Sequence, residues 1–164
     1  STLSSSSAAS DVYKRQQNAS RATEELTVAL KEQIDQGLIE VEQRDGKVFV
    51  TVGSGGAFPS GTADLTGEAQ RIMDRIALTA MSPDSSITVT GHTDDVPISN
   101  GQFRDNWDLG AGRAASVVQA IQNTGLISGD RLSAVSKGEM APLADNNTAA
   151  GREQNRRIEI EISY

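Results

Sequence analysis

SITVTGHTDDVP, residues 86–97, joins a strand pattern to a polar cluster and decides how the chain folds around it. Isoleucine and valine alternate with threonine in its first half, which is typical of a strand with one buried face. The strand pattern ends at GHTDD, which holds the single histidine of the chain, His92, followed by Asp94 and Asp95. These residue types fit a metal site, an acid/base pair, a salt bridge or a ligand clamp.

Periodic apolar residues on both sides of this strand predict a domain of mixed helices and strands. Apolar residues at steps of three and four predict helices, and alternating apolar residues predict strands. An Asp-Gly pair at 45–46 predicts a tight hairpin between the first two strands. The expected elements are a leading helix over 22–38, strands over 38–43 and 47–52, a helix over 65–80, a strand over 87–91, a helix that begins near 106 or 107, and strands over 132–136 and 157–163.

The order of these elements predicts a β-α-β-α-β-β domain of the α+β class, an α/β sandwich preceded by an N-terminal helix. Two β-α-β crossovers, right-handed by the general rule, place both helices on one face of a mixed sheet. Residues 1–17 crowd six serines into the first ten positions and show no periodicity. They are predicted to be disordered or foreign to the native chain. Residues 18–40 then form a linker helix, and residues 41–164 form the domain.

Composition excludes several kinds of partner and site. The 164 residues carry a formal charge of -7, with no stripe rich in lysine or arginine, so no nucleic acid is expected as a partner. The chain has no cysteine, which excludes disulfides and thiolate metal sites. No apolar run approaches the roughly 20 residues that a membrane-spanning helix requires.

Two glycine-rich patterns look like phosphate-binding loops but lack the residues that bind phosphate. The stretch GSGGAF, residues 53–58, places Phe58 where a dinucleotide fingerprint needs its third glycine. Residues 56–61 have the glycine spacing of a P-loop, but Thr62 stands where the lysine is needed. No nucleotide and no other cofactor is therefore expected.

A metal site at GHTDD is disfavoured by its geometry. In an extended stretch His92 and Asp94 point to one side and Asp95 to the other, and no second histidine completes a zinc set. We therefore expect His92 to pack or hydrogen-bond at the end of the strand. A metal-dependent hydrolase stays a remote alternative, and no catalytic residue is assigned because the spacing places no activated nucleophile beside His92.

The helix NWDLGAGRAASVV supplies a basic residue that can face the acidic strand end. Asn106, Leu109 and Arg113 are three and four residues apart, so their side chains line one stripe of that helix. One carboxylate, from Asp94, and one guanidinium across a shallow pocket suit a zwitterion. The alternative is a simple Asp94–Arg113 salt bridge that ties strand to helix.

Three ordered motifs, GHTDD, NWDLGAGRAASVV and GREQNRRIEIEI, resemble the OmpA-like peptidoglycan-binding domain. The resemblance covers Val41 to Ile162. The stretch FPSGTADLT, the loop DDVPISNGQFRDNW and Trp107 are most similar to the stator branch, MotB and PomB, with the sodium-driven type as a weaker resemblance. Gly110 and Gly112 stand where the family often has serine and a helix-favouring residue, which predicts a looser pocket wall.

The resemblance implies how the pocket is used. The family binds the diaminopimelate of the peptidoglycan stem peptide, a zwitterionic centre, through the aspartate after GHT and the arginine before RA. These motifs place the two charges on Asp94 and Arg113. The peptidoglycan-binding residues expected from the resemblance are Thr93, Asp94, Asn106, Leu109, Arg113 and Arg156.

The resemblance also implies an assembly. It predicts the periplasmic domain of a single-pass inner-membrane protein in a Gram-negative bacterium, which anchors a flagellar motor stator to the cell wall. The expected partners are peptidoglycan, a second copy of the chain in a homodimer, and a membrane protein of the MotA or PomA type. An envelope-tethering protein of the OmpA or Pal type, without a motor role, is the alternative.

Overall fold

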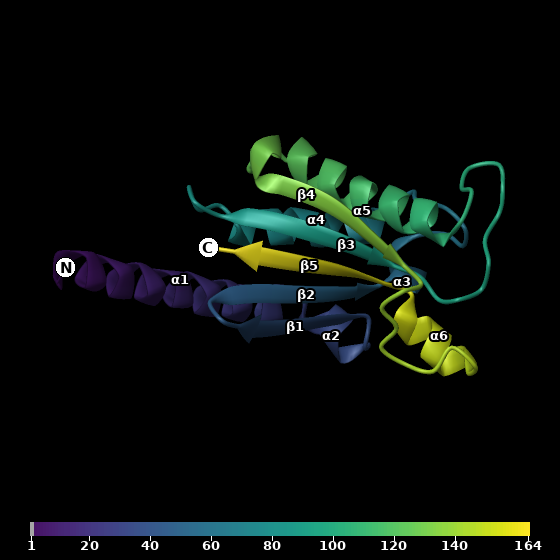
Figure 1. The fold of residues 1–164 in the computed structure, drawn as a ribbon, viewed down its shortest axis with the longest axis horizontal. Helices are drawn as coiled ribbons and strands as arrows, with labels where there is room; N and C mark the ends of the chain where they lie inside the picture. Colours follow the sequence, from purple (N-terminus) through teal and green to yellow (C-terminus); the bar gives the residue numbers. More distant parts are fainter. Residues whose placement is uncertain (1) are drawn as a thin grey trace.

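The computed structural model describes residues 2–164, which form one mixed five-stranded sheet with its main helices on one face (Figure 1). The strand order is β1-β2-β5-β3-β4, with β3 and β4 parallel and the other neighbours antiparallel. The predicted fold class is confirmed. The strands are β1 (Ile39–Arg44), β2 (Lys47–Gly53), β3 (Ser86–His92), β4 (Leu132–Gly138) and β5 (Arg157–Ser163).

The helices divide into long ones that cover the sheet and short ones near its ends. The long helices pack their apolar residues on the same face of the sheet. Among residues 2–164, no helix is long and apolar enough to cross a membrane. The long helices are α1 (Thr2–Ala29), α4 (Gly67–Thr79) and α5 (Asn106–Asn123), and the short ones are α2 (Lys31–Asp35), α3 (Ser54–Ala57), α6 (Ala149–Asn155) and the 3-10 turn Gly129–Arg131.

The core follows the period of two that the sequence predicted. Val50 of β2 pairs with Ile160 of β5, which in turn pairs with Val89 of β3, and all three side chains are buried beneath the helices. Glu159 and Glu161 alternate with the isoleucines of β5 and are only partly buried. The alternation therefore separates a helix-covered face from a more exposed one.

The hairpin between β1 and β2 turns at the predicted Asp45-Gly46 pair. Both residues have positive φ angles, 53° and 73°. Two successive residues of this kind make a type I′ turn, whose twist matches that of the flanking strands. The turn therefore places β1 at the edge of the sheet and β2 between β1 and β5.

The structure adds a helix between β4 and β5 that the sequence did not predict. Helix α6 begins after Thr148, whose side chain accepts a hydrogen bond from the Gly151 backbone N–H at 3.0 Å. Its sequence, AAGREQN, has no apolar stripe, so the periodicity that predicts helices is missing. After α6 the chain returns through the middle of the sheet, where β5 separates β2 from β3.

The leading segment is helical in the structure. Helix α1 extends from Thr2 through the stretch for which disorder or a foreign origin is predicted. The helix predicted over 22–38 is interrupted at Leu30, between α1 and α2. Residues of α1 enter the core of the domain, because Ala22 and Leu26 are fully buried.

Candidate functional site

A pocket of about 510 Å³ opens where β3 ends, between α5, α6 and the segment after β2. Its walls combine charged side chains with the apolar Phe58, Leu109 and Ile98. Every side chain that the sequence analysis assigned to peptidoglycan binding lines it. These are Thr93, Asp94, Asn106, Leu109, Arg113 and Arg156.

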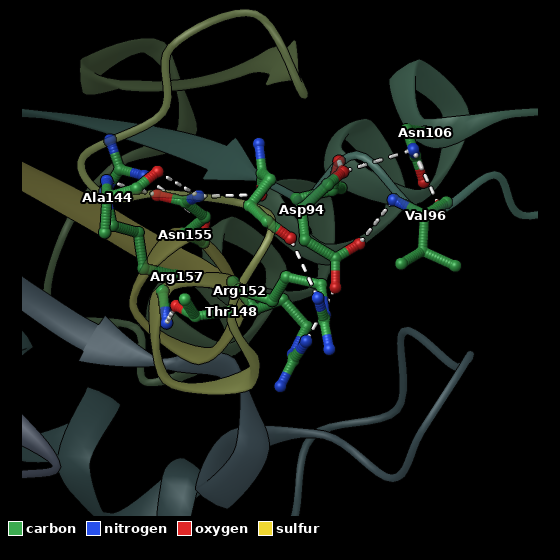
Figure 2. A network of polar contacts seen from close by, with 12 residues as sticks. Asp94, Val96, Asn106, Ala144, Thr148, Arg152, Asn155 and Arg157 are labelled. Atoms are coloured by element: carbon green, nitrogen blue, oxygen red, sulfur yellow. Dashed lines mark hydrogen bonds and ion pairs between the residues drawn. The ribbon is translucent and has the colours of Figure 1, made fainter.

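Asp94 lies two residues after the end of β3, and its carboxylate has two partners. Arg156 donates from Nη1 to Asp94 Oδ2 at 2.6 Å, and the Val96 backbone N–H donates to Oδ1 at 3.1 Å. Asn106 holds the turn after β3 by donating from Nδ2 to the Val96 and Asp94 carbonyl oxygens, at 3.1 and 3.3 Å (Figure 2). The Thr93 hydroxyl also donates to the Asp94 carbonyl oxygen, at 2.8 Å. The carboxylate is therefore fixed at the pocket wall.

Arg113 lies two turns into α5 and is almost entirely buried, with 5% of its surface exposed. Its Nε donates to the Thr62 carbonyl oxygen at 2.8 Å, and its guanidinium carbon lies 4.9 Å from the centre of the Phe58 ring. Burial and, second to it, the nearby positive charge of Arg156 lower the pKa of Arg113 to about 10, against the opposing effect of Asp94. The side chain therefore stays protonated at neutral pH.

The salt bridge in the pocket is not the one that spacing suggested. Within residues 2–164, Asp94 pairs with Arg156, and Arg113 has no carboxylate partner. The alternative of a simple Asp94–Arg113 salt bridge is therefore wrong. The Nη groups of Arg113, which donate to no described residue, remain available to an anion in the pocket.

His92 has a structural partner outside this pocket, as predicted. Its Nε2 lies 3.2 Å from Glu159 Oε2, and Arg157 donates from Nε to Glu159 Oε1 at 2.8 Å. The hydrogen bond to His92 lowers the pKa of Glu159 to about 2, against burial and with help from Arg157. Among the described residues, no three side chains of the metal-binding types are gathered to hold an ion.

A buried asparagine fixes the position of α6 beside the pocket. Asn155 is fully buried, and its side chain accepts from the backbone N–H groups of residues 143 and 144 and donates to residues 144 and 146 (Figure 2). Arg152 also donates to the carbonyl oxygen of residue 146, at 2.8 Å. Arg152 and Arg156 are four residues apart, so both reach the pocket from one side of this segment.

The pocket-lining residues that sequence reasoning missed include Arg152, Phe58 and Ser54. Arg152 carries a signal, its spacing of four from Arg156, but that spacing has meaning only once α6 is known to be a helix. In the sequence, Phe58 marks only a break in a glycine pattern. The Ser54 hydroxyl is buried without a hydrogen-bond partner among the described residues, and no sequence pattern marks it.

The glycines of α5 bring the helix close to the sheet rather than loosening the wall. A Cβ atom built on Gly91 of β3 would lie 2.1 Å from the Gly110 carbonyl oxygen, so the two backbones are in direct contact. A Cβ on Gly112 would lie 2.9 Å from the Phe103 ring. The predicted looser packing is therefore wrong at Gly110, where a small residue permits the close approach.

The family follows from the segment that contains this pocket. The sequence model of the OmpA family matches residues 57–156, which is more than half of the chain and includes all six predicted binding residues. This chain belongs to the OmpA family. The predicted resemblance is confirmed, because the family match covers the first two motifs and the first half of the third, and the relatives include motility proteins.

Two proteins with sequences similar to this chain carry functional names. Motility protein B of Bacillus subtilis is 32% identical over 125 residues, which cover 76% of this chain and 48% of that protein. The peptidoglycan-binding protein ArfA of Mycobacterium bovis is 33% identical over 108 residues, 65% of this chain and 32% of that protein. The chain spans about half the length of the Bacillus protein and about a third of the length of ArfA.

Two solved structures share the OmpA-family fold of this chain. The cell wall anchor of the T6SS from Pseudomonas aeruginosa has a TM-score of 0.77 and 31% identity, and covers 84% of this chain and 96% of its own. The periplasmic domain of Helicobacter pylori MotB has a TM-score of 0.69 and 27% identity, and covers 76% and 81%. The fold is therefore similar to that of both a motility protein and a wall anchor.

Proposed function

We propose that this domain binds peptidoglycan and anchors a membrane complex to the cell wall, without catalysing a reaction. The observation that carries the proposal is the buried Arg113, which has no carboxylate partner among the described residues, in one pocket with the Asp94 carboxylate. A pocket with one free guanidinium and one carboxylate on separate walls suits a ligand that carries both charges. The names of the relatives, a peptidoglycan-binding protein and a cell wall anchor, support the same ligand.

The ligand in this proposal is the zwitterionic end of diaminopimelate in the stem peptide. Arg113 donates its Nη hydrogens to the carboxylate, and Asp94 accepts from the ammonium group. Phe58 and Leu109 contact the methylene chain between the two centres of the amino acid. Each charged hydrogen bond contributes on the order of 1.5–3 kcal/mol, so a single site binds weakly.

A weak site suits an anchor that is used in several copies. Linked sites in a homodimer, or in a ring of complexes, raise the overall affinity without new contacts. The relatives named motility protein B support a stator role, in which the missing partner is a membrane protein of the MotA type and the domain lies in the periplasm. The sodium-driven form of such a motor belongs to this proposal as well.

Co-sedimentation with insoluble peptidoglycan tests the wall-binding part. Asp94→Ala and Arg113→Ala should each lower the bound fraction at least tenfold while the circular dichroism spectrum stays native. Arg104→Ala is a matched control, because Arg104 is an exposed arginine paired with Asp108 on the same helix end and does not line the pocket. Undiminished binding by both pocket variants would rule out the proposed clamp, in which Asp94 and Arg113 hold the two charges of the ligand.

A tether without a motor role is the second candidate, because the T6SS anchor is matched over almost its whole length. The two candidates differ in what cells lose. If the protein is a stator component, Asp94→Ala in the chromosomal gene abolishes swimming while the cell envelope stays intact. If it is a tether, swimming persists in the variant. If it is a stator component of the sodium-driven type, swimming of the wild type also stops when potassium replaces sodium in the medium.

A further inference from the structure

The pocket holds more positive charge than a zwitterionic ligand needs. Among the described residues that line it, three carry guanidinium groups, Arg113, Arg152 and Arg156, and only Asp94 carries a carboxylate. A zwitterion brings no net charge, so binding it leaves this excess in place. An uncompensated cluster of cations in a partly enclosed pocket favours a ligand with additional negative charge.

Arg156 has hydrogen-bond donors to spare. Its Nη1 is engaged with Asp94, while Nε and Nη2 donate to no other described residue. The side chain is 39% exposed, so these donors are open to the pocket rather than sealed in the core. Asp94 therefore orients Arg156 without using all of its capacity.

Arg152 stands beside Arg156 in the same way. Its Nη1 donates to the Asn146 carbonyl oxygen, which holds the stem of the side chain and leaves its other donors without a described partner. Both arginines extend from a segment fixed by the buried Asn155, so they are held in place before a ligand arrives. Two forked donors at fixed positions match the geometry of a carboxylate.

We propose that Arg152 and Arg156 form a subsite for a second carboxylate of the ligand that the Asp94–Arg113 clamp holds. The inference rests on the proposed function and narrows its ligand to stem peptides with one ammonium and at least two free carboxylates. Two groups can supply the second carboxylate: the α-carboxylate of the neighbouring glutamyl residue, and the carboxylate on the other centre of diaminopimelate. Wall peptides in which that group is amidated are therefore bound more weakly.

Titration with soluble peptides separates these sources. The probes are the tripeptide N-acetyl-L-Ala-γ-D-Glu-meso-diaminopimelate, whose single ammonium is that of diaminopimelate, and three forms of it, each with one carboxylate converted to an amide. Binding is measured by isothermal calorimetry on the whole chain. We expect amidation of one of the two outer carboxylates to weaken binding about tenfold or more, and the position of that amide identifies the source. Amidation at the centre held by the clamp tests the proposed function separately.

Variants then assign the effect to the subsite. Arg152→Gln and Arg156→Gln should weaken binding of the parent tripeptide and abolish its advantage over the discriminated amide, while Arg104→Gln keeps that advantage. Because Arg156 also contacts Asp94, Arg152→Gln is the decisive variant. Equal binding of the parent and both outer amides, with weak binding of the clamp amide, would overturn the subsite and leave the clamp standing. Failure of every peptide to bind would overturn both.

Discussion

Arg156 reaches Asp94 across 62 residues of sequence and donates a 2.6 Å hydrogen bond to its carboxylate. The acidic end of β3 is therefore already paired before a ligand arrives. An incoming ammonium group shares the carboxylate with this arginine, whereas Arg113 meets an incoming carboxylate without competition from a described acidic residue. Before a ligand binds, Asp94 is therefore already in an ion pair and Arg113, among residues 2–164, is not.

Asp94→Asn should reduce ligand binding while leaving the fold intact. Asparagine keeps an oxygen for the Val96 backbone N–H but removes the charge that attracts an ammonium group. We expect peptidoglycan affinity to fall about 10- to 100-fold, with a change in unfolding free energy below about 1 kcal/mol. Sedimentation with peptidoglycan and urea unfolding measure the two effects. The exposed neighbour variant Asp95→Asn is the control, and an equal loss in both variants would contradict the assignment.

Asn155→Ala should destabilise the domain strongly. The fully buried side chain satisfies two backbone N–H groups and one carbonyl oxygen of the loop before α6, and alanine leaves these partly buried groups without that partner and a cavity in place of the amide. We expect a loss of about 3 kcal/mol in the free energy of unfolding, measured by urea titration. Asn147→Ala, on the exposed part of the same loop, should change it by less than about 0.5 kcal/mol. Comparable losses would show that the network does not hold α6.

Gly91→Ala should also destabilise the fold, for a steric reason. The added methyl group would meet the Gly110 backbone at 2.1 Å, and a helix backbone cannot give way as a flexible side chain does. We expect a loss of about 2–3 kcal/mol and a lower midpoint of thermal unfolding. A Cβ on Gly101 meets no atom within 4 Å, so Gly101→Ala serves as the reference. Wild-type stability in Gly91→Ala would mean that α5 moves freely on the sheet.

The stability of the domain should fall in acid partly through Glu159. Its pKa in the folded protein, about 2, lies below its ordinary value of 4.5, so the ionised side chain stabilises the fold above pH 5. That contribution is lost as the pH falls from about 5 to 2, and because the side chain is 41% exposed we expect it to be only about 1 kcal/mol.

Glu159→Gln tests this expectation in urea titrations between pH 2 and pH 7. The variant should be less stable than the wild type at pH 7 and nearly equal to it at pH 2, because most of the stabilisation from the ionised carboxylate is lost by that pH. Glu153→Gln, at an exposed position, should leave the acid dependence unchanged. A constant difference between Glu159→Gln and the wild type at all pH values would place the effect elsewhere.

The sequence by itself determined the features that depend on neighbouring residues. The alternating isoleucines of β5, the helical spacing of α4 and α5, and the Asp45-Gly46 turn follow from backbone sterics and from which side chains avoid water. The spacing of Asn106, Leu109 and Arg113 likewise placed three pocket residues on one helix stripe. These patterns act over a few residues, so they can be read without the rest of the chain.

Only the tertiary structure decided the relationships between distant segments. It placed β5 between β2 and β3, and it paired Asp94 with Arg156 rather than with Arg113. It also formed α6, whose position depends on the buried Asn155 rather than on an apolar stripe, and so brought Arg152 to the pocket. The physical reason is that a side chain's partner depends on which atoms approach within about 3 Å once the whole core has packed. Spacing along the chain does not specify that approach.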